Sequence, residues 1–202
     1  MEEGFVFLDE VLPGIRWDAK YATWDNFTGA PVDGYEVNRI AGTPALAGAL
    51  RVARDRAAEL GFGLLLWDGY RPQRAVDRFR AWSEGPDDPV TKAAFHPGID
   101  RAEMWTRGYI ADRSGHSRGA AVDLTLFRLD DLELADMGGR HDLMDARSHH
   151  GAPGLSGTVA RNRRTLCVVM EASGFERYDR EWWHYVLSDE PHPDTYFDVP
   201  IR

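Results

Sequence analysis

Several features that mark large classes of protein are scarce in this sequence. Cys167 is the one cysteine, which excludes an intramolecular disulfide and a structural zinc site made of cysteines. No apolar run reaches the about 18 residues of a membrane-spanning helix. The chain starts acidic with a four-residue apolar run, whereas a signal peptide needs a basic start and an apolar stretch of roughly 7–15 residues. These absences predict a soluble, cytoplasmic protein, with export by an unusual route left open.

Positive charge is also in short supply. The chain has 24 Lys and Arg against 33 Asp and Glu, which gives a net charge of −9. A general nucleic-acid binder needs a basic face to neutralise phosphates, and an anionic membrane would repel such a chain. We therefore expect neither nucleic acid nor membrane as a partner. A homodimer is left open.

The residues that are present suit a folded chain. Hydrophobic residues make up 43% and aromatic residues 11%, which is enough for one core in 202 residues. No linker rich in Pro, Gly or Ser divides the sequence, and no internal repeat is visible. We therefore expect a single domain spanning residues 1–202.

Local patterns predict both helices and short strands. Thr43-Pro44 combines a good N-cap with the residue favoured at the first helical position, and apolar residues then recur at helical spacing up to a stop at Gly61. The other expected elements are, in order, short strands and loops over 1–42, a buried strand at 64–67, a helix at about 72–82, a loop at 83–99, a short helix at about 100–107, a strand at 121–129 that returns through 132–137, a glycine-rich excursion at 138–157, a helix from Thr158 to about 173, and closing strands at 175–178 and 182–187. Helices and antiparallel hairpins in this order favour an α+β domain.

Three dispersed residues have the chemistry of metal ligands. His116 and Asp123 lie in the stretch 114–123, and His184 lies in the aromatic stretch 181–185. Two imidazoles and one carboxylate fill three positions of a tetrahedral zinc ion and leave the fourth for water. Glu181, three residues before His184, is a spare carboxylate that could take that water's proton. The set therefore indicates metal-assisted hydrolysis.

The spacing of these residues restricts how they can meet. His116 and Asp123 are an odd number of residues apart, so one continuous strand would point them to opposite faces. Gly115 and Gly119 allow the bend that would bring them together. Glu181 and His184 are three residues apart, again an odd number, so Glu181 is expected on the turn that enters the strand of His184.

Each residue has an ordinary explanation when taken alone. Asp123 could lie on the solvent face of a half-exposed strand, and His116 could be a surface residue. His184 could be a packed core histidine, and Glu181 a solvated residue at the start of a strand. The combination of all four favours the metal site.

Arg71 is a further candidate, in a turn just after the buried strand. A fixed guanidinium there could stabilise an oxyanion, or it could pair with Asp68 and brace the turn. A second metal site at His149-His150 is a weaker alternative. Cys167 falls inside a predicted helix and is better explained as a packed residue than as a nucleophile.

The stretches 114–123 and 181–185 resemble the zinc D-alanyl-D-alanine dipeptidases of the VanX type, peptidase family M15. Their Ser-x-His-x6-Asp and Glu-x-x-His patterns are the broader signature of the hedgehog/DD-peptidase superfamily. The resemblance extends over nearly the whole chain, through residues 17–29, 34–39, 64–72, 144–150 and 189–198.

The resemblance implies a fold and a reaction. The fold would be hedgehog/DD-peptidase-like, with a central antiparallel sheet and flanking helices. One zinc ion would be held by His116, Asp123 and His184. With Glu181 as base and Arg71 as transition-state stabiliser, the enzyme would hydrolyse D-Ala-D-Ala to two D-alanines. The D,D preference comes from the resemblance alone, and the role would be glycopeptide resistance or turnover of cell-wall peptides.

The same resemblance points to the substrate pocket. Tyr21, Ser114 and Asp142 match positions near the bound dipeptide, and the excursion at 138–157 is the candidate cover. Two residues depart from the family pattern, because Gly115 stands where a second serine is common and His141 where an aromatic is common. Both belong to the rim of the pocket, where they would affect affinity and packing of the cover.

Two other functions compete with the dipeptidase. A D,D-carboxypeptidase or endopeptidase acting on cell-wall peptides would normally need export or an open groove. A zinc-containing binding module without hydrolysis would need neither Glu181 nor Arg71, and both residues are present.

Overall fold

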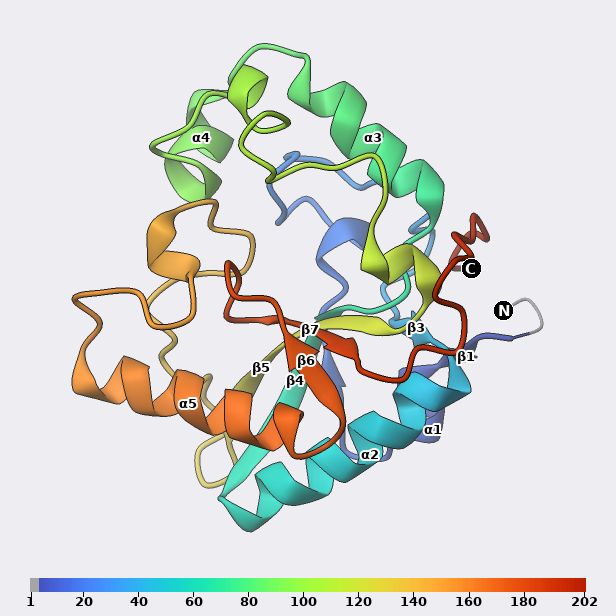
Figure 1. Cartoon of the computed structure of the whole chain (residues 1–202), viewed down its shortest axis with the longest axis vertical. Helices are drawn as coiled ribbons and strands as arrows, with labels where there is room; N and C mark the ends of the chain where they lie inside the picture. Colours follow the sequence, from blue (N-terminus) through green and yellow to red (C-terminus); the bar gives the residue numbers. More distant parts are fainter. Residues whose placement is uncertain (1–3) are drawn as a thin grey trace.

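A five-stranded sheet lies at the centre of the computed structural model, which describes residues 4–202 (Figure 1). The acidic start of the chain, residues 1–3, lies outside the described residues. The strands follow the order β2, β4, β5, β7, β6, with bounds Arg16–Trp17, Phe62–Asp68, Ala121–Arg128, His184–Leu187 and Phe175–Arg177. Neighbours are antiparallel except for β2 and β4, which run parallel. The α+β class is confirmed, but the sheet is mixed and not the wholly antiparallel sheet that was expected. The parallel edge arises because the chain crosses over through a helix between these two strands.

Two long helices cover one face of this sheet. α2 (Pro44–Glu59) and α5 (Gly157–Glu171) pack against the strands and against each other, along the lower side of Figure 1. The Thr43 side chain caps α2 by accepting a hydrogen bond from the Leu46 backbone N–H, as predicted. α5 is capped by Ser156 and not by the expected Thr158. The apolar residues between these helices and the strands form the core on this face of the sheet.

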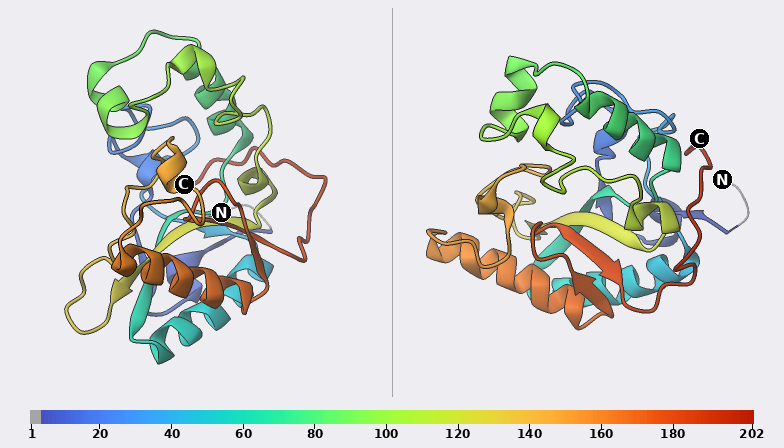
Figure 2. Two further views of the ribbon diagram at one scale, coloured as in Figure 1. Left: turned by 60° about the vertical axis from the view of Figure 1, so that its left-hand side comes forward. Right: turned by 45° about the horizontal axis from the view of Figure 1, so that its top comes forward.

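The opposite side of the sheet carries a second apolar cluster. It is built from Phe79 and Trp82 of α3 (Gln73–Ser83) and from aromatic residues of the N-terminal segment, among them Phe5, Tyr21, Phe27 and Tyr35. Both views in Figure 2 show this layer separated from α2 and α5 by the sheet. Residues 121–127 of β5 are therefore buried on both faces.

Some expected elements differ from the structure. The predicted loop at 83–99 contains helix α4 (Pro89–Phe95), which Asp88 caps through the backbone N–H groups of Val90 and Thr91. The first 42 residues hold the expected strands β1 (Val6–Phe7) and β3 (Ala41–Gly42), but also the helical turns α1 (Leu8–Val11) and η1 (Lys20–Ala22). Near residue 101 only the short 3-10 helix η2 (Arg101–Glu103) forms.

The C-terminal segment returns to the centre of the molecule. The Phe197 backbone N–H donates to the Ser117 carbonyl at 2.9 Å, and Ile201 forms a bridge with Tyr35. Arg118 pairs with Glu190 at 2.5 Å. These contacts hold the 3-10 helix η3 (Gly115–Arg118) in place. No helix within residues 4–202 has the length and apolar character needed to cross a membrane.

Candidate active site

His116, Asp123 and His184 meet at one point above the sheet. Asp123 on β5 lies directly opposite His184 on β7, so both side chains leave the same face. His116 arrives from η3. Its Nε2 lies 3.1 Å from His184 Nδ1 and 3.3 Å from Asp123 Oδ1, and His184 Nδ1 lies 3.0 Å from that same oxygen. The three ligand atoms predicted from sequence are therefore brought together.

A bend in the chain delivers His116 to this point. Gly119 follows η3 with a left-handed φ of 77°, and a Cβ there would meet the Phe5 ring at 2.8 Å. The Arg71 backbone N–H donates to the His116 carbonyl at 3.2 Å. The expected break between His116 and Asp123 is thus present. His116 and Asp123 are only 1% and 2% exposed. This excludes the alternatives in which His116 is a surface residue and Asp123 lies on a solvent-facing side of its strand.

The donor set fits a zinc ion. His116 Nδ1 lies 2.7 Å from the Gly69 carbonyl, to which it can only donate a proton. In the neutral imidazole, Nε2 is then left with a lone pair directed at the other two ligands. Bonds of about 2.0–2.1 Å in a tetrahedron place ligand atoms roughly 3.3 Å apart, close to the spacing described above.

The electrostatics of the ligand set centre on Asp123. Burial alone would raise the pKa of this carboxyl, but His116, His141 and His184 outweigh it and hold the pKa well below its usual range. Conversely, burial alone would lower the pKa of His184, yet Asp123 and Glu181 raise it. Asp123 is therefore the ionised centre of the cluster.

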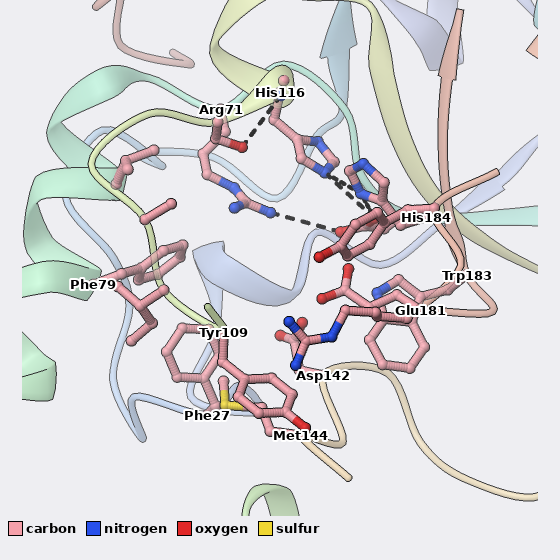
Figure 3. A pocket seen from close by; sticks show the side chains of 18 of the residues that line it. Phe27, Arg71, Phe79, Tyr109, His116, Asp142, Met144, Glu181, Trp183 and His184 are labelled. Atoms are coloured by element: carbon pink, nitrogen blue, oxygen red, sulfur yellow. Dashed lines mark hydrogen bonds and ion pairs between the residues drawn. The ribbon is translucent and has the colours of Figure 1, made fainter. Parts of the chain in front are cut away.

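Glu181 lies in the connection between β6 and β7, as predicted. Its backbone N–H donates to the Tyr178 carbonyl, and its own carbonyl accepts from the His184 N–H. The carboxylate points toward the ligand set in Figure 3. Burial raises the pKa of Glu181 to about 7. A carboxyl with such a pKa exchanges protons readily near neutral pH.

Arg71 braces the turn and also faces the cavity. Its Nε and Nη2 both lie 2.9 Å from Asp68 Oδ2, so the carboxylate does brace the turn. Its guanidinium also lines the cavity beside the ligand set, with Nη2 3.6 Å from Asp123 Oδ2. Asp68 in turn accepts from the Tyr35 hydroxyl at 2.7 Å. The guanidinium is thus held rigidly at the cavity wall.

A cavity of about 330 Å³ opens onto these groups. Tyr21, Ser114 and Asp142, the predicted substrate-contacting residues, all line it. So do residues that the sequence did not single out, namely Phe27, Val76, Phe79, Tyr109, Arg113, Met144, Tyr178, Arg180 and Trp183. Most of these are aromatic or apolar and scattered along the chain. No local pattern distinguishes them from core residues, and only the tertiary structure brings them to one wall.

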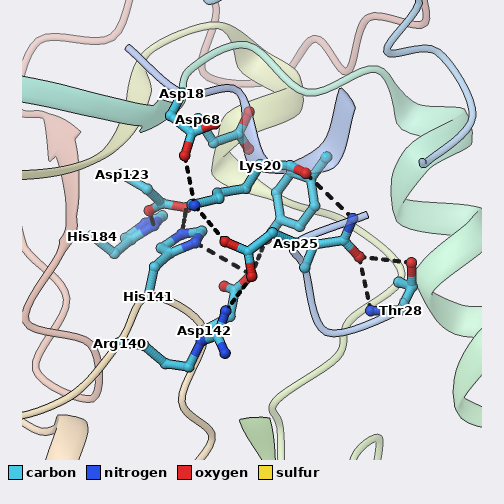
Figure 4. A network of polar contacts seen from close by, with 12 residues as sticks. Asp18, Lys20, Asp25, Thr28, Asp68, Asp123, Arg140, His141, Asp142 and His184 are labelled. Atoms are coloured by element: carbon cyan, nitrogen blue, oxygen red, sulfur yellow. Dashed lines mark hydrogen bonds and ion pairs between the residues drawn. The ribbon is translucent and has the colours of Figure 1, made fainter. Parts of the chain in front are cut away.

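The predicted cover, residues 138–157, carries two adjacent polar side chains, His141 and Asp142, that contact residues of the site. His141 Nε2 lies 3.2 Å from Asp123 Oδ2, and Asp142 accepts from the Tyr21 hydroxyl at 2.9 Å (Figure 4). Burial raises the pKa of Asp142. Burial alone would lower the pKa of His141, but the carboxylates of Asp142 and Asp123 raise it. The sequence does not predict this network, because it places His141 only at the rim.

The weaker candidates lie elsewhere. His149, His150 and Cys167 line a separate groove beside α5. Within residues 4–202, neither histidine joins a group of three potential metal ligands. Cys167 is buried in α5, as expected of a packed residue.

Comparison with known proteins gives full-length matches. The family described as D-ala-D-ala dipeptidase, Peptidase_M15, matches residues 1–202. The chain is 61% identical to the D-alanyl-D-alanine dipeptidase of Enterococcus faecium and 65% identical to that of Streptomyces coelicolor, in both cases over 100% of each chain. The Escherichia coli K12 protein of the same name is 32% identical over 90% of this chain and 83% of its own length. Among solved structures, the zinc complex of a mutant vancomycin-resistance D,D-pentapeptidase, VanY, covers 75% of each chain with 20% identity and a TM-score of 0.42.

Proposed function

This chain belongs to the Peptidase_M15 family of D-Ala-D-Ala dipeptidases and is therefore a peptidase, and we propose that it hydrolyses D-Ala-D-Ala at the site of His116, Asp123 and His184. The convergence of these three ligand atoms beside the Glu181 carboxyl carries the proposal. The three side chains would hold one zinc ion. Zinc supplies Lewis-acid polarisation of a carbonyl and lowers the pKa of a coordinated water.

Glu181 is the proposed general base. Burial raises its pKa to about 7 in the metal-free chain, so it is a stronger base than an ordinary carboxylate. It can accept a proton from the attacking water and return that proton to the leaving amine. A carboxylate with an ordinary pKa would be a weaker base for the first step. Its place on a turn, fixed by two backbone hydrogen bonds, keeps it on the cavity side of the ligand set.

Arg71 is the proposed stabiliser of the oxyanion. Its guanidinium is permanently charged and held by Asp68, so little reorganisation is needed when negative charge develops on the substrate carbonyl. Its position over the Tyr21 and Phe79 rings, 5.0 and 5.2 Å from their centres, restricts it further.

The cavity suits a small ligand with two charged ends. Asp142, positioned by Tyr21, offers a carboxylate that can pair with a substrate ammonium group. Arg113 and Arg180 line the same cavity and can pair with a substrate carboxylate. Arg180 also donates to the Arg107 carbonyl at 3.1 Å and so joins two segments of the wall. Such a cavity favours a free dipeptide over a longer peptide.

The test compares the parent protein with Glu181→Gln, using Glu176→Gln on the exposed side of β6 as the matched control. We expect all three proteins to carry one zinc ion per chain by metal analysis. Release of D-alanine from D-Ala-D-Ala should fall by roughly 10²–10⁴-fold in Glu181→Gln and stay unchanged in the control.

Other substrates decide between the proposal and its rivals. L-Ala-L-Ala and an N-acylated tripeptide ending in D-Ala-D-Ala should be poor substrates of the parent. Preferred cleavage of the acylated peptide would establish a D,D-carboxypeptidase instead. A zinc-loaded parent that leaves every one of these peptides intact would establish a binding module, and equal cleavage of L-Ala-L-Ala would refute the D,D preference.

A further inference from the structure

We propose that His141 is a positioning residue that fixes the Asp123 carboxylate and links it to Asp142. The inference rests on the proposed function, because it assigns Asp123 to the metal and Asp142 to the substrate. The imidazole lies between two carboxylates: Nε2 is 3.2 Å from Asp123 Oδ2, and Nδ1 is 3.4 Å from Asp142 Oδ2 (Figure 4).

The two oxygens of Asp123 have different partners. Oδ1 faces His116 and His184 and is the ligand atom. Oδ2 lies 3.2 Å from His141 Nε2 and 3.6 Å from Arg71 Nη2. A carboxylate that binds through one oxygen keeps its orientation only if the other oxygen has a donor. His141 is the nearer of these two donors.

The imidazole itself is held by packing. His141 is 4% exposed, its ring lies 4.9 Å from Trp67 at an interplanar angle of 35°, and the Trp183 ring crosses it at 5.5 Å. These two indoles leave little room for rotation. A donor that cannot turn away loses less entropy when it holds its acceptor, so the contact with Asp123 is pre-organised.

The backbone explains how both side chains reach the same place. Adjacent residues in an extended chain point to opposite sides. Asp142 instead has a left-handed φ of 60°, which is rare for a residue other than glycine. His141 and Asp142 can therefore both face inward. The unfavourable backbone conformation of Asp142 lets both side chains face inward, and such backbone strain is common at binding sites.

The second contact extends the network toward the substrate. Asp142 Oδ2 receives the Tyr21 hydroxyl at 2.9 Å from one side and lies 3.4 Å from His141 Nδ1 on the other. Asp123, His141, Asp142 and Tyr21 thus form a continuous chain of contacts. It joins the proposed metal ligand to the proposed site of the substrate ammonium group, so a change at His141 should affect both.

Two amide replacements separate these contacts. In His141→Gln, the new side-chain amide can occupy the position of Nε2 and keep a donor for Asp123, whereas in His141→Asn the shorter amide can occupy only the position of Nδ1. His141→Phe keeps a ring against Trp67 and removes both contacts. The zinc dissociation constant of metal-free protein, measured by competition with a chromophoric chelator, reports the first contact without any need for hydrolysis.

We expect His141→Asn and His141→Phe to raise the zinc dissociation constant by about 10–100-fold, and His141→Gln to change it by less than about threefold. At saturating zinc, His141→Gln should raise KM for D-Ala-D-Ala with kcat nearly unchanged, because Asp142 has lost one of its two partners. His96→Gln is the control, since His96 is equally buried but bonds the Ile99 carbonyl. It should leave both quantities unchanged.

The outcomes separate this proposal from its premise. A His141→Phe protein that binds zinc as tightly as the parent would overturn the positioning role, and so would equal weakening in His96→Gln. If His141→Phe fails to fold, the zinc dissociation constants of His141→Gln and His141→Asn still test the positioning role, and equal values in these two variants would overturn it. Zinc affinities that follow the expected order in a protein without dipeptidase activity would reject the proposed function and leave the role of His141 at Asp123 intact.

Discussion

At the scale of single residues, the site is set by partners that lie outside the ligand set. Gly69 fixes the tautomer of His116 through its carbonyl, and Asp68 fixes the guanidinium of Arg71. The proposed ligands and Glu181 could be singled out in the sequence because only a few residue types bind metals or transfer protons. The Gly69 contact could not be predicted, because a backbone carbonyl leaves no trace in the sequence. The pairing with Asp68 was predicted only as one of two alternative roles for Arg71.

The raised pKa of Glu181 predicts a pH-dependent stability. The carboxyl has an ordinary pKa of 4.5 when unfolded and about 7 when folded. Between these values the folded protein retains a proton that the unfolded chain has released, so the free energy of unfolding falls as pH rises. In Glu181→Gln this carboxyl is absent, so the variant lacks the corresponding fall in the free energy of unfolding. In metal-free protein, the variant should gain on the order of 2 kcal/mol relative to the parent between pH 4 and pH 8, after allowance for partial solvent exposure.

Chemical denaturation at both pH values checks this expectation. Both proteins contain the same other titrating groups. The informative quantity is therefore the difference in free energy of unfolding between Glu181→Gln and the parent, and how this difference changes from pH 4 to pH 8. The exposed Glu176→Gln control should show no such change. A stability difference between Glu181→Gln and the parent that is the same at pH 4 and pH 8 would mean that the Glu181 pKa is not raised.

At the scale of elements, the segment 138–150 depends on one arginine of α5. Arg163 is 4% exposed and donates to three backbone carbonyls, those of Met137, Arg147 and His149, at 2.8–3.1 Å. Burial lowers the pKa of its guanidinium to about 10. The helix on one side of the sheet thus secures the segment that carries His141 and Asp142 on the other.

Arg163→Met should therefore loosen the pocket without removing a metal ligand. We expect faster amide hydrogen exchange over residues 141–149, a KM raised by about tenfold, and unchanged zinc content, since the loss of buried hydrogen bonds to a charged group costs roughly 1.5–3 kcal/mol each. Arg164→Met, on the exposed face of the same helix, is the control. Uniformly faster exchange across the sheet would instead indicate general destabilisation.

The elements differ in how well the sequence predicts them. α2 has a cap, a first-turn proline, regular apolar spacing and a glycine stop, and its bounds were predicted closely. α4 has only seven residues, and its Asp88-Pro89 cap is hidden among other prolines and glycines. The parallel pairing of β2 with β4 joins segments that are far apart in sequence, and no local pattern encodes it. The left-handed backbone of Asp142 is likewise set by tertiary contacts.

At the scale of the whole molecule, zinc should stabilise the fold. The proposed ligands come from β5, β7 and η3, so the site exists only when these elements are assembled. Zinc at about 100 times its dissociation constant should raise the free energy of unfolding by about 2.7 kcal/mol. Thermal and chemical denaturation with and without chelator measure this effect. Asp123→Asn should abolish most of the response, and a full response in that variant would place the metal elsewhere.

The direct pairing of Asp123 with His184 has a consequence for folding fidelity. A slip of β7 by one residue would turn the His184 imidazole to the opposite face and set an aromatic neighbour in its place. Such a chain could still bury its tryptophans, but it could not gather the three proposed ligands. The number of zinc ions bound per chain would then count the molecules whose strands are correctly aligned, and chelation would leave misaligned molecules unaffected.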